Sequence, residues 1–224
     1  MHEATAASEP YSANSDAITP PKLTVKNIKC SAKLKTDLKL DDIRKRSVYI
    51  FGLNCKVFNN FIVLKNPQNS QRIVLFKEKI DKKSRGCHAN LTGISSFKAV
   101  DECIDLLSKI ADCNPQTSIS NKIDNISGTT DALQLLLHQY KRKDINLQKL
   151  SEYLRNCLQD TTSVNVRYHP DVFGSIIITF NECTVLLYCS GKSVILGGRT
   201  LTAIAQAVKW IISQVTNALK MGSI

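Results

Sequence analysis

Cysteine and histidine are the side chains of this sequence that could support metal or thiol chemistry. The chain contains 8 cysteines and 4 histidines, and no two cysteines are spaced as C-x-x-C. The adjacent pair Cys87 and His88, and the isolated His169, match neither the ligand spacing of a closed zinc site nor a nucleophile beside its base. We therefore predict no metal site, and a thiol enzyme that uses Cys87 and His88 remains an alternative.

Other signatures of catalysis and cofactor binding are missing. The sequence has no G-x-x-x-x-G-K-[ST] or G-x-G-x-x-G phosphate loop, no H-E-x-x-H and no G-x-S-x-G. We therefore expect no cofactor and no enzymatic activity. Most cysteines lie in apolar patterns such as "DECIDLL", and the N-terminus lacks the features of an export signal. This combination predicts buried, reduced thiols inside a cell.

The charge of the chain points to a polyanionic partner. There are 30 Lys and Arg against 19 Asp and Glu, which gives a net charge of +11 and a pI near 9.3. A basic protein gains affinity for nucleic acid because each phosphate contact releases counterions. No apolar run reaches the roughly 18 residues that a membrane helix needs, so we expect no membrane contact.

The elements that must position any functional residues occur twice along the chain. Each half reads as a strand, a short helix, several strands and a long amphipathic helix. The first long helix starts near Phe97, where Ser95 or Ser96 can cap it. Four pairs of residues match between the halves: Asn27 with Asn125, Phe58 with Phe173, Phe76 with Tyr188 and Gly93 with Gly197. Extra residues at 133–144 ("LQLLLHQYKRKD") interrupt the second half, and their role stays open.

This repeat predicts an α+β fold. Two sheets joined edge to edge would form one curved antiparallel sheet, with the two long helices on its convex side and the other face open to water or a ligand. We expect a flexible N-terminal tail at 1–21, a first repeat at 22–114, a second repeat at 115–220 and a short C-terminal tail at 221–224.

Several segments in both halves carry a resemblance to a known family. They are "VKNIKCSAKL" and "NLTG" in the first half, and "KIDNISG", "YHPDVFGSIIITF" and "TVLLYCSGKSVILGGR" in the second. In this order they resemble the TATA-box-binding protein family. The resemblance implies a saddle that binds A/T-rich promoter DNA in the minor groove and bends it with paired aromatic wedges, as this family is known to do.

The resemblance also implies roles for individual residues. The wedges would be Phe58, Phe76, Phe173 and Tyr188. The minor-groove contacts would be Asn27, Asn125, Thr92 and Val194, and the phosphate contacts Lys56, Lys192 and Arg199. Asp171 would belong to the docking surface for proteins like transcription factor IIB, in recruitment of the RNA polymerase apparatus.

Departures from the family pattern keep a second function open. Leu196 replaces a threonine of the DNA-binding face, Lys29 replaces a valine, and Asn59 follows the first wedge. The alternative is a protein-interaction module on the same fold that has lost DNA bending. The Lys-, Asn- and Ile-rich composition is typical of a large DNA virus or a fast-evolving eukaryote, so we expect the protein in the nucleus or at the site of viral transcription.

Overall fold

A single sheet organises the molecule in the computed structural model, which describes residues 22–79, 85–158 and 163–224. Among these residues, ten antiparallel strands lie in the order β2-β3-β4-β5-β1-β6-β10-β9-β8-β7. The strands are β1 (Leu23–Lys35), β2 (Asn54–Val57), β3 (Phe61–Lys65), β4 (Arg72–Lys79), β5 (Arg85–Ile94), β6 (Ile119–Thr130), β7 (Val164–His169), β8 (Phe173–Phe180), β9 (Thr184–Tyr188) and β10 (Ser193–Gly198). The helices are α1 (Leu40–Tyr49), α2 (Phe97–Ala111), α3 (Pro115–Ser118), α4 (Ala132–Gln139), α5 (Leu147–Cys157) and α6 (Leu201–Lys220).

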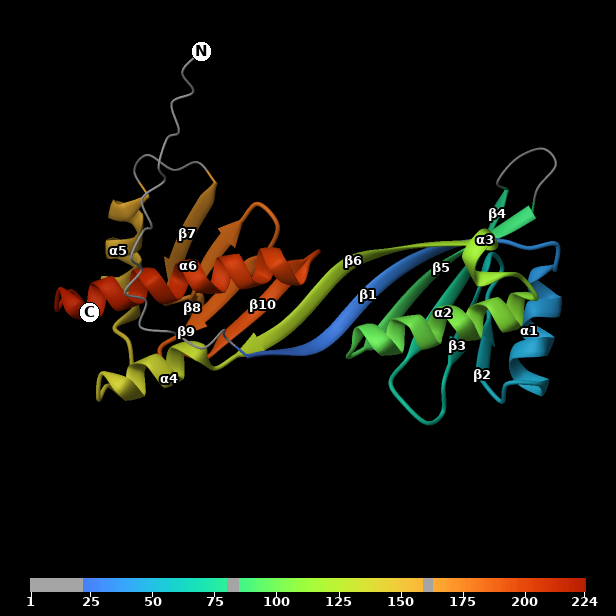
Figure 1. Cartoon of the computed structure of the whole chain (residues 1–224), viewed down its shortest axis with the longest axis horizontal. Coiled ribbons are helices and arrows are strands. Elements are labelled where there is room, and N and C mark those ends of the chain that lie inside the picture. The colour runs from blue at the N-terminus through green and yellow to red at the C-terminus, as the bar shows by residue number, and fades with distance from the viewer. Residues whose placement is uncertain (1–21, 80–84, 159–162) are drawn as a thin grey trace, which may run out of the picture.

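The two halves join through β1 and β6. These strands pair antiparallel from Leu23 opposite Thr130 to Leu34 opposite Ile119, and Figure 1 shows them running side by side between the halves. Outward from β1 the strands follow in the order β5, β4, β3 and β2, and outward from β6 they follow in the order β10, β9, β8 and β7. The two halves of the sheet therefore have the same topology and form an internal repeat. The predicted fold, one curved antiparallel sheet made of two tandem halves, is confirmed.

Each half has its own hydrophobic core between the sheet and a long helix. In the first half, alternate residues of β1 such as Ile28 and Leu34 are fully buried with Leu107 of α2. In the second half, Ile195 of β10 packs in one cluster with Val215 of α6. Because strand side chains alternate between faces, this burial uses only one face of the sheet. Helices α2 and α6 cover that face in both halves (Figure 1).

The long helices begin at side-chain caps. Ser96 Oγ accepts a hydrogen bond from the Ala99 N–H at 3.2 Å, and Thr200 Oγ1 accepts one from the Ala203 N–H at 3.1 Å. Such caps satisfy backbone N–H groups that the first helical turn leaves unpaired. Of the two predicted caps of α2, the structure selects Ser96.

The chain ends and the insertion add detail to the predicted organisation. The predicted N-terminal tail, residues 1–21, lies outside the described residues. Within the predicted C-terminal tail, Ile224 is buried in the second core. The insertion at 133–144 forms most of helix α4 and the loop that leads to α5, and Leu133, Leu136 and Leu137 bury one side of α4 in the second core.

Candidate nucleic-acid interface

The open face of the sheet is the face opposite α2 and α6 (Figure 1). It carries the strand side chains that alternate with core residues. In the first half and centre these are Asn27, Lys29, Ser31, Lys33, Asn54, Lys56, Phe61, Val63, Lys65, Arg72, Val74, Phe76, His88, Asn90 and Thr92. In the second half they are Asn125, Ser127, Thr129, Asn165, Arg167, Ser175, Ile177, Thr179, Thr184, Leu186, Tyr188, Val194 and Leu196.

A row of rings crosses the outer strands of the first half. Phe58 stacks on Phe61 with ring centroids 4.5 Å apart and an interplanar angle of 15°, and Phe61 lies 5.4 Å from Phe76. Phe76 in turn lies 6.3 Å from His88. Phe58 occupies the β2–β3 turn, where its N–H donates to the Phe61 carbonyl, and its side chain is 46% exposed. The first half therefore presents a stacked aromatic surface rather than a single ring.

Phe61 is a member of this row that the sequence analysis missed. It lies directly opposite Phe76 in the β3–β4 ladder. No motif marks it, because its place beside Phe76 depends on the β3–β4 register.

The second half carries a smaller aromatic pair. The rings of Phe173 and Tyr188 meet edge to face at 6.4 Å, and Phe173 is 41% exposed. Opposite Tyr188 in the β8–β9 ladder lies Ser175, where the first half has Phe61. Ser175 is buried, and its Oγ has no hydrogen-bond partner among the described residues. All four predicted wedge residues thus lie outside the two cores, while their wedge role stays a prediction.

The two predicted amides occupy matching places on the central strands but differ in their hydrogen bonds. Asn27 Oδ1 accepts from the Gly93 N–H at 2.8 Å, which leaves its amide hydrogens to donate elsewhere. The Asn125 Oδ1 is buried without a partner among the described residues. Gly93 and Gly197 share a left-handed backbone, with φ of 73° and 77°, at matching irregularities of β5 and β10. The backbones of the two halves therefore resemble each other more closely than their side-chain hydrogen bonds do.

Thr92 and Leu196 are the matching residues of β5 and β10. Thr92 lies opposite Arg72, and Leu196 lies opposite Thr184. Leu196 is 41% exposed, so the open face of the second half presents an apolar side chain where the first presents a hydroxyl. Val194, the predicted groove contact, is half-buried between Thr129 and Leu186 of the neighbouring strands.

Cationic side chains surround this apolar surface. Lys56 lies on β2, Lys192 is exposed in the β9–β10 turn, and Arg199 is exposed just after β10. The structure adds Lys65 and Arg72, which lie opposite each other on β3 and β4. Across residues 22–79, 85–158 and 163–224, the four ion pairs lie on or beside α1 and α2, so none neutralises these open-face cations.

Asp171 lies in the turn between β7 and β8, at the same end of the strands as the β9–β10 turn that holds Lys192. It is exposed beside Val172, whose side chain is 85% exposed. The turn therefore presents an acidic and an apolar side chain together at the end of the second half.

The geometry does not assemble a thiol-based catalytic site from Cys87 and His88. Cys87 is 3% exposed in the first core, whereas His88 lies on the open face beside Phe76. Adjacent residues of a strand point to opposite faces, so the thiol and the imidazole cannot meet. In the same core, burial raises the pKa of Cys103 to about 11, which keeps that thiol protonated at neutral pH. No three potential metal ligands gather anywhere in the part of the chain that the structure describes.

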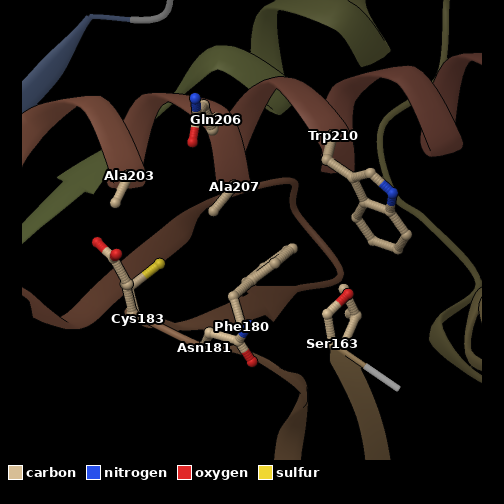
Figure 2. Close-up of a pocket in the computed structure, with 10 residues that line it drawn as sticks. Ser163, Phe180, Asn181, Cys183, Ala203, Gln206, Ala207 and Trp210 are labelled. Atoms are coloured by element: carbon tan, nitrogen blue, oxygen red, sulfur yellow. The ribbon is translucent and has the colours of Figure 1, made fainter. Parts of the chain in front are cut away.

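A pocket of about 380 Å³ lies on the other side of the sheet, between α6 and the β8–β9 turn (Figure 2). Its wall includes Phe180 and Trp210, which meet edge to face at 5.6 Å, and the buried Cys183. Burial raises the pKa of the Cys183 thiol, so it is a poor nucleophile. The pocket faces away from the open face and contributes nothing to it.

None of the described helices is both long and apolar enough to cross a membrane.

Comparisons with known proteins agree with this arrangement. The family model "Transcription factor TFIID (or TATA-binding protein, TBP)" matches residues 121–218, which is the second half. Among solved structures, the Methanococcus jannaschii TBP superposes with a TM-score of 0.57 at 17% identity, covering 88% of this chain and 99% of that chain. A comparison with curated protein sequences finds no match.

The structural match extends over both halves, whereas the family model reaches only the second. The first half therefore has a similar backbone arrangement, although the family model does not match its sequence. The predicted resemblance to the TBP family is confirmed: the family model matches the second half, and the fold is similar to that of the Methanococcus jannaschii TBP.

Proposed function

We propose that this protein is a transcription initiation factor that binds A/T-rich promoter DNA in the minor groove and bends it with its aromatic side chains. One observation carries the proposal: exposed rings lie at both ends of an open face whose backbone has the TBP fold. Phe58, Phe61 and Phe76 form one set, and Phe173 and Tyr188 form the other.

The rings supply the bending. An apolar side chain pushed between two base pairs unstacks them, and the free-energy cost is offset by the larger contact surface of a bent duplex. Phe58 and Phe173 are suited to this role because nearly half of each side chain is already exposed. Phe61 supports Phe58 by stacking on it, so little conformational entropy is lost on insertion.

The central amides supply the preference for A·T pairs. The minor-groove edge of an A·T pair offers only the acceptors N3 and O2, and a G·C pair adds a donor. Because Gly93 holds the Asn27 oxygen, the amide nitrogen of Asn27 is left to donate to those acceptors. Asn125 and Thr92 would complete the polar contacts, and Val194 would contact the groove without hydrogen bonds.

Cations at the margins would bind the phosphates. Lys56, Lys192 and Arg199 are all exposed, and Lys65 with Arg72 extends the set on the first half. Neutralising phosphates gives affinity without sequence preference and makes binding weaken as salt rises.

Recruitment of the transcription apparatus would follow from binding. The exposed turn that holds Asp171 and Val172 would dock a protein like transcription factor IIB, which brings the RNA polymerase apparatus to the promoter. The protein would act in the nucleus, or at the site of viral transcription, without an enzymatic activity or a cofactor.

A bending assay tests the proposal. We expect wild type to raise energy transfer between the labelled ends of an A/T-rich duplex, and Phe173→Ala to remove much of that increase. Phe97→Ala is the matched control, because Phe97 has a similar exposure of 39% but lies at the start of α2 on the helix side. Equal energy transfer with and without wild-type protein would contradict the proposal.

A second candidate function is a protein-interaction module that no longer bends DNA. It is favoured by Leu196, Lys29 and the exposed Asn59, which change the apolar character of the open face. This alternative predicts that wild type and Phe173→Ala both leave the duplex unbent while a transcription factor still binds the protein.

A further inference from the structure

The loop between α4 and α5 carries an exposed run of positive charge. Lys141, Arg142 and Lys143 are consecutive and exposed, and Asp144 is the acidic residue that follows them. Within the described ranges, the ion pairs leave all three cations unpaired. The loop belongs to the insertion that interrupts the repeat, so the first half has no counterpart.

The backbone holds this loop in a defined shape. The Lys141 N–H donates to the His138 carbonyl at 3.0 Å, and the Arg142 N–H donates to the Leu137 carbonyl at 2.9 Å. These bonds form a Schellman motif, which closes a helix with a left-handed residue that is usually glycine. Lys141 takes that position with φ of 54°. Glycine would be less strained at this position than lysine.

The loop is fastened to the β9–β10 turn. The Ile145 N–H donates to the Cys189 carbonyl at 2.8 Å. In the same turn Gly191 lies so close to α4 that a Cβ added to it would be 2.8 Å from the Gln134 nitrogen. Figure 1 shows α4 beside the ends of β9 and β10. The loop that carries the three cations is therefore bonded to the turn that holds the exposed Lys192.

We propose that Lys141, Arg142 and Lys143 form an additional phosphate-binding element, which contacts the duplex backbone just outside the base step opened by Phe173 and Tyr188. This inference rests on the proposed function, because Lys192 beside the loop is there a phosphate contact. A duplex is favoured over an acidic peptide because the loop is bonded to the turn that carries Lys192, at the margin of the open face.

Salt titrations with two duplexes test this element. One duplex ends at the edge of the A/T-rich site, and the other extends about five base pairs, half a helical turn, beyond each edge. We expect wild type to bind the extended duplex more tightly, with a salt slope steeper by about 0.9 for each added phosphate contact. The variant K141Q/R142Q/K143Q should lose this gain, while its binding to the short duplex changes little.

A charge-matched control and a single variant distinguish the loss of these particular charges from a general loss of charge or a folding defect. K109Q/K209Q/K220Q removes the same charge from exposed positions of α2 and α6 and should keep the gain. Lys141→Gly removes one charge at a position whose backbone suits glycine, so it should fold and lower the slope for the extended duplex by about 0.9.

The other possible outcomes show whether the phosphate-binding element, the proposed function or both are wrong. If wild type binds and bends the short duplex but gains nothing from the extension, the phosphate-binding element is wrong and the proposed function stands. If wild type binds neither duplex, both fail. If a labelled polyglutamate peptide binds wild type but not K141Q/R142Q/K143Q, and duplex binding is unchanged, the loop serves an acidic protein partner instead.

Discussion

The two halves of the sheet share a backbone but present different chemistry on the open face. The first half has three rings in a row and a pair of cations, Lys65 and Arg72, across β3 and β4. At the matching positions of β8 and β9, the second half has Thr179 and Thr184. Its open face is instead aliphatic, with residues such as Leu196.

This difference shows that the fold and the open face obey separate constraints. Each core needs apolar residues on one side of every strand, and both halves meet this need with Ile, Leu and Val. The opposite side chains contribute little to burial and are free to change. The first half thus presents more positive charge, and the second half more aliphatic surface.

The largest expected effect concerns the rings themselves. Phe58→Ala/Phe76→Ala and Phe173→Ala/Tyr188→Ala should each lower duplex affinity about 100-fold, since a ring stacked on a base is worth about 1–3 kcal/mol. Each double variant should also remove about half of the energy transfer in the bending assay, because each set opens one base step. An undiminished response in one double variant would show that only one half bends the duplex.

Phe61 sharpens the same comparison. Because it stacks on Phe58, Phe61→Ala should weaken bending by loosening the support of that ring, with a smaller loss of affinity than Phe58→Ala. Titration of the labelled duplex measures both effects. A larger loss of affinity for Phe61→Ala than for Phe58→Ala would show that Phe61 inserts between the base pairs and that Phe58 packs against it.

The next effect concerns charge. Lys65→Gln/Arg72→Gln should lower the slope of log affinity against log salt by about 1.8, since each phosphate contact contributes about 0.9. Thr179→Lys/Thr184→Arg places the same charges at the matching positions and should raise the slope by a similar amount. If the first variant leaves the slope unchanged, the charge difference between the halves has no bearing on DNA.

Much of the fold can be predicted from the sequence because buried apolar residues recur at the regular spacing of a strand or a helix. The alternation in β1 and the 3.6-residue period of α2 and α6 predict which faces are buried, and the strand order follows from the repeat. Helix α4 was not predicted, because its leucines lie in an insertion without a counterpart in the first half.

The candidate site is less predictable from sequence than the fold. Most side chains assigned through the resemblance reach the open face, since their strand parity is fixed by their buried neighbours. Phe61, Lys65 and Arg72 were missed, because their positions depend on the β3–β4 register rather than on a motif. The unpartnered Asn125 Oδ1 was equally hidden, since only coordinates show that the Gly93 contact of Asn27 has no counterpart.

A smaller effect is expected at Thr92 and Leu196. Leu196→Thr should raise affinity for an A/T-rich duplex about fivefold, because a new hydrogen bond contributes roughly 1 kcal/mol. Thr92→Val should lower affinity by a similar factor. A G·C-rich duplex measured in parallel is the control. Equal changes on both duplexes would mean that these residues do not read base edges.

The smallest effect separates the two amides in the protein without DNA. Asn27→Ala removes the acceptor of the Gly93 N–H and should lower the free energy of unfolding by about 1 kcal/mol. Asn125→Ala removes a buried oxygen that has no partner in the described structure, so its cost should be a few tenths of a kcal/mol. Urea unfolding measures both. Equal losses would show that Asn125 is also anchored in solution, and that the difference between the halves is confined to their outer strands.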